Sequence, residues 1–360
     1  MTTYIQRVIK KNSKVTIKVP KKISKHVTMM IGTNGKKNHA SMARLNNVSY
    51  RDLHIKKNEV NDCIKESEKF LIETVKNLAT EENKGFLIAD FTFLQKLFAQ
   101  NIPSITYDYS GTEKRVSKGL STGFLFWSNG EITVPLNFNF WRRYKDVGEL
   151  YAKKTDLVKS LILYAKINEI PFQEILLDGA FPSKDMLHFL DNEQVKYTIR
   201  IPKNRKITSK EGSYKLSEHP ALTLQKNQKY KTVQGEYKGI HAYFTVHKRT
   251  GKNNTKETVY IISNVNRPSA QHVAVFAQRW GAEKCFRSMK QYLGLADCQS
   301  TDADKQKLHI FMVMISYTVL QLLKSDKKKY SVEAILHLIR FQKKHHFLFD
   351  YTHLEQTIMS

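Results

Sequence analysis

Apolar and polar positions divide the chain into helical ends and a strand-rich middle. Apolar residues recur at helical spacing over Val60–Leu78, whereas short β-branched and aromatic runs bounded by turn residues predict strands further along. We expect these strands at Gly85–Asp90, Ser104–Ser110, Gly119–Ser128 and Glu131–Phe140, with Asn129-Gly130 as the hairpin turn between the last two. A helix over Val147–Asn168 and a buried strand over Glu174–Asp178 should follow.

The region after Asp178 combines a capped helix with a second group of strands. Ser183 is placed to cap a helix over Lys184–Leu190. Glu283 comes 105 positions after Asp178, which is more than a strand-to-helix connection needs. Further strands are expected at Tyr197–Pro202, Tyr230–Val233, Ile240–His247 and Thr258–Ser263, and they predict a β-rich insertion.

Both ends of the chain are predicted to be helical. In Ser41–Leu53, a turn at Asn46-Asn47 and a cap at Ser49 resemble a helix-turn-helix, although short helices joined by an Asn turn also occur in ordinary bundles. The apolar stretch His309–Leu323 is too short and too polar to span a bilayer, so it predicts a buried helix. Ser331–Phe341 has the pattern of a final amphipathic helix suited to packing or dimer contact.

The charge of the chain predicts a polyanionic partner. The net charge is +26 and the pI is about 9.7. Met1–Lys57 contains fourteen Lys or Arg against Asp52 alone, and Ile201–Lys256 contains thirteen against three acids. Two such clusters favour two DNA-facing surfaces, and a basic tail that binds an acidic protein is the alternative. Three cysteines without CxxC spacing support neither a disulfide framework nor a zinc site, and they fit a reducing cytoplasm.

One segment places several charged residues on one side of a predicted helix. At about 100° per residue, an arc of about 80° holds Phe276, Arg279, Glu283, Arg287 and Lys290. A lone acid among cations suits a site in which the carboxylate binds a metal and the cations hold phosphates. A solvated helix face with ion pairs at i,i+4 is the alternative.

Two further acids are candidates to share a metal with Glu283. Asp90 and Asp178 each close a short apolar run, and the ends of buried strands are where function concentrates in an open α/β sheet. Each could instead be a turn or cap residue. Asp108 is a rival metal ligand, but its predicted strand neighbours are polar, so we place it below Asp90.

These motifs resemble the insertion-sequence-4 family of DDE transposases. The spacing of Arg279, Glu283 and Lys290 is similar to the family's Tyr-Arg-Glu-Lys signature, with Phe276 in place of the Tyr. Asp178-Gly179-Ala180-Phe181 is similar to the second-Asp region, and Asp90-Phe91-Thr92 with Lys96 resembles the first-Asp motif. The resemblance covers about Gly85–Leu323. The order of three antiparallel strands, a crossover helix and a further strand is that of an RNase H-like core.

The resemblance implies a site and an activity. Asp90, Asp178 and Glu283 would be the catalytic residues and would hold two Mg²⁺ ions, for which Mn²⁺ can substitute. Phe276, Arg279, Arg287 and Lys290 would contact DNA. The implied activity is the cutting and joining of the element's own ends, cut-and-paste through a hairpin intermediate. The partners would be double-stranded DNA and terminal inverted repeats, bound by a homodimer in the cytoplasm at the nucleoid, without a membrane.

The expected fold is α/β, an RNase H-like core with a β-rich insertion before the Glu helix and a helical DNA-binding module in front. The expected divisions are 1–84 for the N-terminal module, 85–190 and 269–325 for the two parts of the core, 191–268 for the insertion and 326–360 for a helical tail. Two rival functions remain open at this point. One is an inactive or adopted transposase that only binds DNA, and the other is an RNase H-like nuclease or resolvase without preference for end sequences.

Overall fold

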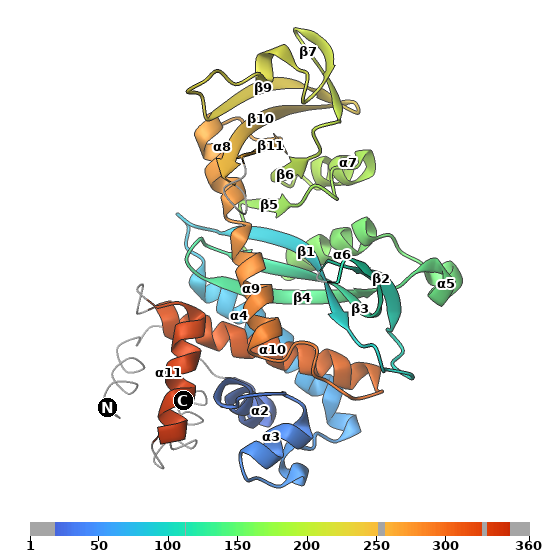
Figure 1. Cartoon of the computed structure of the whole chain (residues 1–360), viewed down its shortest axis with the longest axis vertical. Coiled ribbons are helices and arrows are strands. Elements are labelled where there is room, and N and C mark those ends of the chain that lie inside the picture. Colours follow the sequence, from blue (N-terminus) through green and yellow to red (C-terminus); the bar gives the residue numbers. More distant parts are fainter. Residues whose placement is uncertain (1–18, 112, 251–255, 326–329, 346–360) are drawn as a thin grey trace.

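The structure is a computed structural model that describes residues 19–111, 113–250, 256–325 and 330–345. Its described part is mixed α/β, with one large, mostly antiparallel sheet covered by helices (Figure 1). The strands are β1 (Phe86–Gln95), β2 (Thr106–Ser110), β3 (Arg115–Ser128), β4 (Thr133–Trp141), β5 (Glu174–Leu177), β6 (Tyr197–Ile201), β7 (Lys206–Ser209), β8 (Gly212–Lys215), β9 (Tyr230–Tyr237), β10 (Ile240–Thr250) and β11 (Lys256–Ser263). The α-helices are α2 (Lys21–Gly32), α3 (His39–Leu45), α4 (Val60–Leu78), α5 (Tyr144–Val147), α6 (Lys154–Ile167), α7 (Lys184–Asn192), α8 (Ser269–Ala277), α9 (Trp280–Gln291), α10 (Ala303–Ser325) and α11 (Val332–His345). Short 3₁₀ turns are η1 (Tyr50–Leu53), η2 (Lys57–Glu59), η3 (Gly148–Leu150) and η4 (Pro220–Leu222).

The strands before residue 202 form the part of the sheet that carries the predicted acids. β1 pairs antiparallel with β3, and β3 pairs antiparallel with both β2 and β4. On its other side β1 pairs in parallel with β5, and β5 pairs in parallel with β6. The Asn129-Gly130 turn between β3 and β4 is confirmed, with φ of 95° at Gly130, a conformation that glycine adopts without steric cost. This arrangement is compatible with an RNase H-like fold.

The strands expected at 197–263 are present and extend the same sheet. β11 pairs with β6, and β10, β9, β7 and β8 follow in that order. β6, which we expected inside the insertion, pairs in parallel with β5. The strands of the insertion are therefore joined edge to edge to the strands that carry Asp90 and Asp178.

A buried helix, α10, lies on the other side of the molecule from the insertion, between the sheet and the N-terminal helices (Figure 1). Its side chains are buried over most of its circumference, including Leu308, Val313 and Leu320, which confirms the prediction of a buried helix. Among the described residues it is the one helix long and apolar enough to cross a membrane, but 89% of that window is buried inside the protein. Such burial is typical of a core helix.

Two predicted helical segments differ from the structure. The helix expected over Val147–Asn168 starts later, at Lys154, because Gly148 has φ of 57° and the chain turns there. In the helix-turn-helix candidate, Ser49 does cap the following turn, accepting a hydrogen bond from the Arg51 backbone N–H at 3.2 Å. The second helix is nevertheless only η1, four residues long, and it is too short to serve as a recognition helix.

The N-terminal helices are packed into the main core. Ile23 and Met30 of α2 and Leu71 of α4 belong to the same buried cluster as the side chains of α10 and the sheet. Arg340 of α11 donates from Nε to the Ile31 carbonyl oxygen at 2.9 Å, which fixes the end of α2. Removing this part of the chain would therefore open the hydrophobic core as well as remove positive charge.

A buried histidine gives the fold a defined sensitivity to acid. His272 of α8 is fully buried, and neither ring nitrogen has a hydrogen-bond partner within the described part of the chain. Burial lowers the pKa of His272 from 6.5 to about 4, and the charge of Arg267 acts in the same direction. Between these two pH values the unfolded chain binds a proton that the folded chain excludes, so stability falls as pH falls.

We therefore expect His272→Phe to reduce the acid sensitivity of the protein. Over the window between pH 6.5 and about 4, the parent should lose about 1.4 kcal/mol more per pH unit than the variant. Urea unfolding followed by circular dichroism at several pH values measures this slope. Equal slopes for the two proteins would show that His272 titrates normally in the folded state.

Candidate active site

Asp90 and Asp178 lie side by side because of the register of two parallel strands. Ala89 of β1 is aligned with Leu177 of β5, so the next residue on each strand is one of the two acids. Asp178 follows the last residue of β5, as expected. Asp90, which we expected at a strand end, lies in the middle of β1, because β1 continues to Gln95 along β3. It therefore marks the end of the parallel pairing with β5.

Glu283 reaches this place from α9, but the helix differs from the prediction. We expected one helix to carry all the residues from Phe276 to Lys290. The structure instead ends α8 at Ala277 and starts α9 at Trp280, with i→i+3 backbone hydrogen bonds across the junction. Gly281 lies so close to β4 that an added Cβ would be 2.4 Å from Thr133 Oγ1. Close packing of the start of α9 against β4 therefore depends on this glycine.

Arg279 connects two of the three acids. One terminal nitrogen, Nη1, donates to Asp90 Oδ2 at 3.2 Å, and the other, Nη2, donates to Glu283 Oε1 at 2.5 Å. The Arg279 side chain is only 13% exposed. The pair with Glu283 is the i,i+4 ion pair expected of a solvated helix face. The contact with Asp90 is not expected of such a face, because Asp90 lies on a strand 189 residues earlier in the chain. The arrangement therefore joins α9 to β1.

The three carboxylates influence one another electrostatically. Burial raises the pKa of the Asp90 carboxyl to about 6, and the neighbouring charges of Asp178 and Glu283 add to this rise, while Arg279 opposes it. Asp178 Oδ1 is buried and has no hydrogen-bond partner among the residues that the structure describes. A buried carboxylate oxygen without a partner is costly, and a cation would satisfy it.

The residues present fit a divalent cation by their chemistry. Three carboxylates supply the hard oxygen ligands that Mg²⁺ and Mn²⁺ prefer. In the described part of the chain no three acidic, His or Cys side chains are already arranged to hold a metal, and Arg279 bridges two of the candidate ligands. Asp90, Asp178 and Glu283 would hold the ion, and Arg279 would have to move first.

The other predicted DNA contacts lie in different surroundings. Phe276 is on α8 and is buried beside Val259 and Ile261, with the Arg279 guanidinium 5.8 Å from its ring centre. Lys290 is exposed and donates to the Phe93 carbonyl oxygen at 3.0 Å, which places it along β1 beyond Asp90. Arg287 is 57% exposed and pairs with Glu333 of α11 at 3.8 Å. Lys290 therefore lies along the strand of Asp90, whereas Arg287 faces α11.

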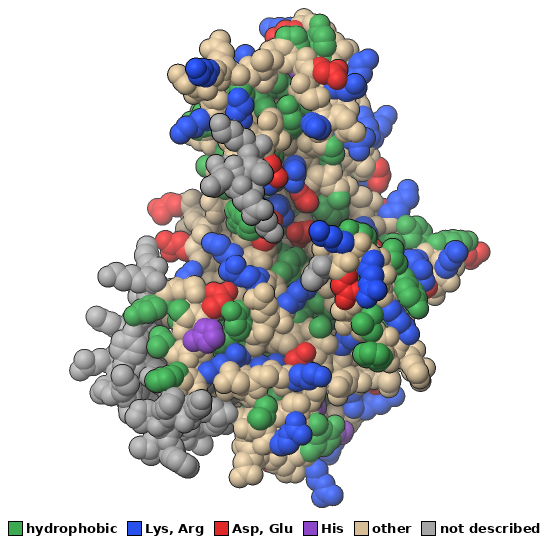
Figure 2. All heavy atoms as spheres, viewed as in Figure 1, with side chains coloured by type: hydrophobic (Ala, Val, Ile, Leu, Met, Phe, Trp, Pro, Cys, Tyr) green, Lys and Arg blue, Asp and Glu red, His purple; other side chains and the backbone are tan. Residues whose placement is uncertain are grey.

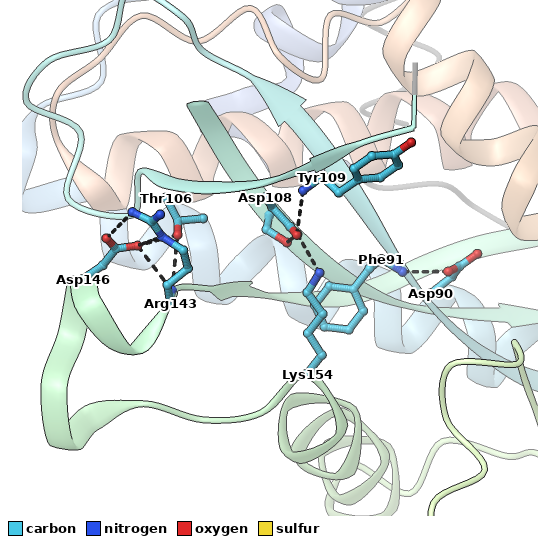
Figure 3. Close-up of polar contacts among 9 residues, drawn as sticks. Asp90, Phe91, Thr106, Asp108, Tyr109, Arg143, Asp146 and Lys154 are labelled. Carbon is cyan, nitrogen blue, oxygen red and sulfur yellow. Dashed lines mark hydrogen bonds and ion pairs between the residues drawn. The ribbon is translucent and has the colours of Figure 1, made fainter. Parts of the chain in front are cut away.

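Asp108 is engaged elsewhere (Figure 3). Its Oδ2 accepts from Lys154 Nζ and from Ser121 Oγ, both at 2.6 Å, and Lys154 also lies over the Phe91 ring. Phe91 and Asp90 are consecutive on β1, so their side chains point to opposite faces of the sheet. Lys154 of α6 lies over Phe91, whereas Arg279 at the start of α9 contacts Asp90. The helix α6 therefore packs on the face of the sheet opposite α9. Asp108 is thus a structural ion-pair partner on the α6 face.

A cleft that the sequence did not indicate lies beside α9. A cavity of about 430 Å³ lies between the β3–β4 hairpin, the first turns of α9 and the ends of α10 and α11. Its lining includes Trp280, Lys284, Arg287, Lys324 and Gln321. Trp280 is 53% exposed, and the buried Gln321 Oε1 has no hydrogen-bond partner among the described residues. Trp280 and Lys284 can be read from the sequence, but the cleft that they line is formed only when α10 and α11 pack beside α9.

One segment of the chain is similar to a known protein family. Residues 156–319 match the transposase DDE domain. The matched range contains Asp178 and Glu283 and begins after Asp90. The match supports a transposase DDE domain in this part of the chain, and DDE transposases generally use divalent metal ions. No curated protein matches the chain.

Proposed function

We propose that the protein is a DDE transposase of the insertion-sequence-4 type, which cuts and joins the ends of its own element. The observation that supports this most is the register of β1 and β5, which puts Asp90 beside Asp178. The Arg279 side chain adds to it, because it bonds to both Asp90 and Glu283. A sheet that aligns two acids and a helix that adds a third provide the ligand set for phosphoryl transfer. The match to the transposase DDE domain points to the same chemistry.

In this proposal each residue has a defined task. Asp90, Asp178 and Glu283 would hold two Mg²⁺ ions, and the chemistry that such ions supply when bound is activation of the attacking oxygen and stabilisation of the leaving oxygen at phosphorus. Lys290 holds a phosphate along β1. The Asp90 side chain is only 22% exposed, so charge interactions at this carboxylate are stronger than in bulk solvent.

The distribution of charge fits DNA on the same face. In Figure 2 a few acidic side chains gather at the narrow waist of the molecule, and Lys and Arg surround them and spread over the part formed by the insertion. A small negative centre within a positive surface allows the phosphate backbone to approach while metal ligands remain available. We propose that the insertion and the N-terminal region hold the terminal repeat at the nucleoid, with two copies of the chain on paired ends.

The cleft beside α9 supports the hairpin route. Forming a hairpin at a DNA end displaces a base, and a displaced base needs an aromatic surface and neighbouring cations. Trp280, Lys284 and Arg287 provide both on α9, the helix that also carries Glu283. We propose that cut-and-paste proceeds through this hairpin intermediate.

Cleavage of a labelled duplex tests the proposal. The duplex should carry the inverted repeat that flanks the gene, with a random duplex of equal length as control. In Mg²⁺ we expect nicked, hairpin and double-cut products from the repeat alone. Binding without cleavage would indicate an inactive or adopted DNA-binding protein, and equal cutting of both duplexes would indicate an RNase H-like nuclease.

Substitution of surface arginines tests the N-terminal contribution to DNA binding without disturbing the core. Arg44 and Arg51 are exposed on α3 and η1. Replacing both with Gln should lower the slope of log affinity against log salt by about 2, because each arginine neutralises about one phosphate. Gel shifts at several salt concentrations measure the slope. An unchanged slope would place recognition outside this region.

A matched pair of lysines on α4 serves as the control. Lys69 and Lys76 pair with Glu73 and Glu169 on the protein surface, so their replacement with Gln should leave the salt slope near that of the parent.

A further inference from the structure

The polar partners of Arg279 among the described residues are acids that a metal would need. Its two terminal nitrogens contact Asp90 Oδ2 and Glu283 Oε1, whereas its buried Nε has no hydrogen-bond partner in the described part of the chain. The ring of Phe276 lies 5.8 Å from the guanidinium carbon. Both hydrogen-bond acceptors of the side chain are therefore candidate metal ligands.

Arg279 and a divalent cation compete for the same oxygen atoms. A guanidinium remains charged at any pH at which proteins are folded, so it cannot leave the site by losing a proton. It can only move, and while it stays it repels an incoming cation over a short distance in a poorly hydrated site. In exchange its positive charge balances the negative charges of Asp90 and Glu283, with which it forms ion pairs.

A DNA phosphate offers Arg279 an alternative partner. The planar fork of a guanidinium binds two phosphate oxygens as well as two carboxylate oxygens. Its unpartnered Nε would gain a hydrogen bond from such a change. Moving Arg279 onto a phosphate would release both carboxylates together.

We propose that Arg279 makes metal loading depend on DNA. The guanidinium holds the carboxylates in the metal-free protein, and a phosphate of bound DNA draws it away, so that metal and DNA bind with positive cooperativity. This inference rests on the proposed function. Because coupling between two ligands is reciprocal, metal also tightens DNA binding by the same factor. Arg279 thus keeps the site free of metal until a DNA strand is bound.

Binding of Mn²⁺ to the full chain, with and without a short duplex of random sequence, tests the coupling. Free Mn²⁺ is measured by electron paramagnetic resonance, and binding to duplex alone is subtracted. The duplex should tighten Mn²⁺ binding to the parent by about 5- to 150-fold. Arg279→Gln should bind Mn²⁺ more tightly than the parent when DNA is absent, and the duplex should then change its affinity less than twofold.

The matched control is Arg115→Gln, which removes the same charge from a surface arginine that pairs with Glu113. This variant should behave as the parent does. Arg279→Lys keeps the charge with a single point of contact, and its affinity without DNA should lie between those of the parent and Arg279→Gln. It preserves the test if Arg279→Gln fails to fold.

The outcomes separate this inference from the proposed function. If the parent binds Mn²⁺ but Arg279→Gln binds it no more tightly, or keeps the full effect of DNA, the role of Arg279 is wrong and the metal site stands. If the parent binds no Mn²⁺ under either condition, both the metal site and the coupling are wrong.

Discussion

Glu283→Gln is expected to abolish DNA cleavage and leave DNA binding in place. The substitution keeps the size of the side chain but removes the charge that a metal needs, so the cutting rate should fall at least about 1,000-fold, or about 4 kcal/mol. DNA affinity should persist or rise slightly, because a negative charge near the phosphates is lost. Cleavage of a labelled repeat in Mg²⁺ and a gel shift in its absence measure the two quantities.

The control for this change is Glu82→Gln, an exposed glutamate before β1. It should cut at the rate of the parent. If Glu283→Gln cuts as fast as the parent, α9 is an ion-pair face and the proposed enzyme is wrong. If it binds no DNA, the loss of cleavage reports damage to the fold.

Arg267→Met is expected to have the largest effect on stability. Arg267 pairs with Glu174 at the start of β5, and their side chains are only 11% and 4% exposed. Glu174 also accepts a hydrogen bond from Thr198 of β6. Removing the arginine leaves a buried carboxylate without its counter-charge, so unfolding should become about 3–5 kcal/mol easier in denaturant titrations.

A double-mutant cycle shows whether this loss comes from the pair. Glu174→Gln combined with Arg267→Met should cost less than the sum of the two single changes, since no unpaired charge remains. Arg249→Met, at the exposed pair with Glu257, should cost less than about 1 kcal/mol. Equal losses at Arg267 and Arg249 would mean that the Arg267 pair is solvated.

Local patterns predicted most strands of the sheet and placed Asp90 and Asp178 on or after buried strands. Alternation, β-branched runs and the Asn129-Gly130 turn act over a few residues, so they can be recognised without knowledge of the fold. Asp178 after an apolar run is a similar local signal. The contact between Arg279 and Asp90 gives no local signal in the sequence, because Asp90 is 189 residues away and only the sheet brings it near.

Helix boundaries were harder to predict for a comparable reason. The break between α8 and α9 lies beside Gly281, which packs closely against Thr133, a contact between distant segments. The four-residue η1 shows the same limit: Leu53 is drawn into the core, and the chain leaves the helical conformation at His54 to reach α4. In both places tertiary contacts overrode a plausible local pattern.

The continuity of the sheet from β5 through β6 into β11 limits how the molecule can grip its substrate. Hydrogen-bonded strands do not hinge freely, so a phosphate held on β9 or β10 stays at a fixed span from Asp90 and Asp178. The sheet therefore fixes the offset along the DNA between the bound sequence and the cleavage site. Lengthening the β9–β10 turn at Lys238-Gly239 or the loop between β6 and β7 should leave this offset unchanged, because neither change alters the order of paired strands between β10 and β5.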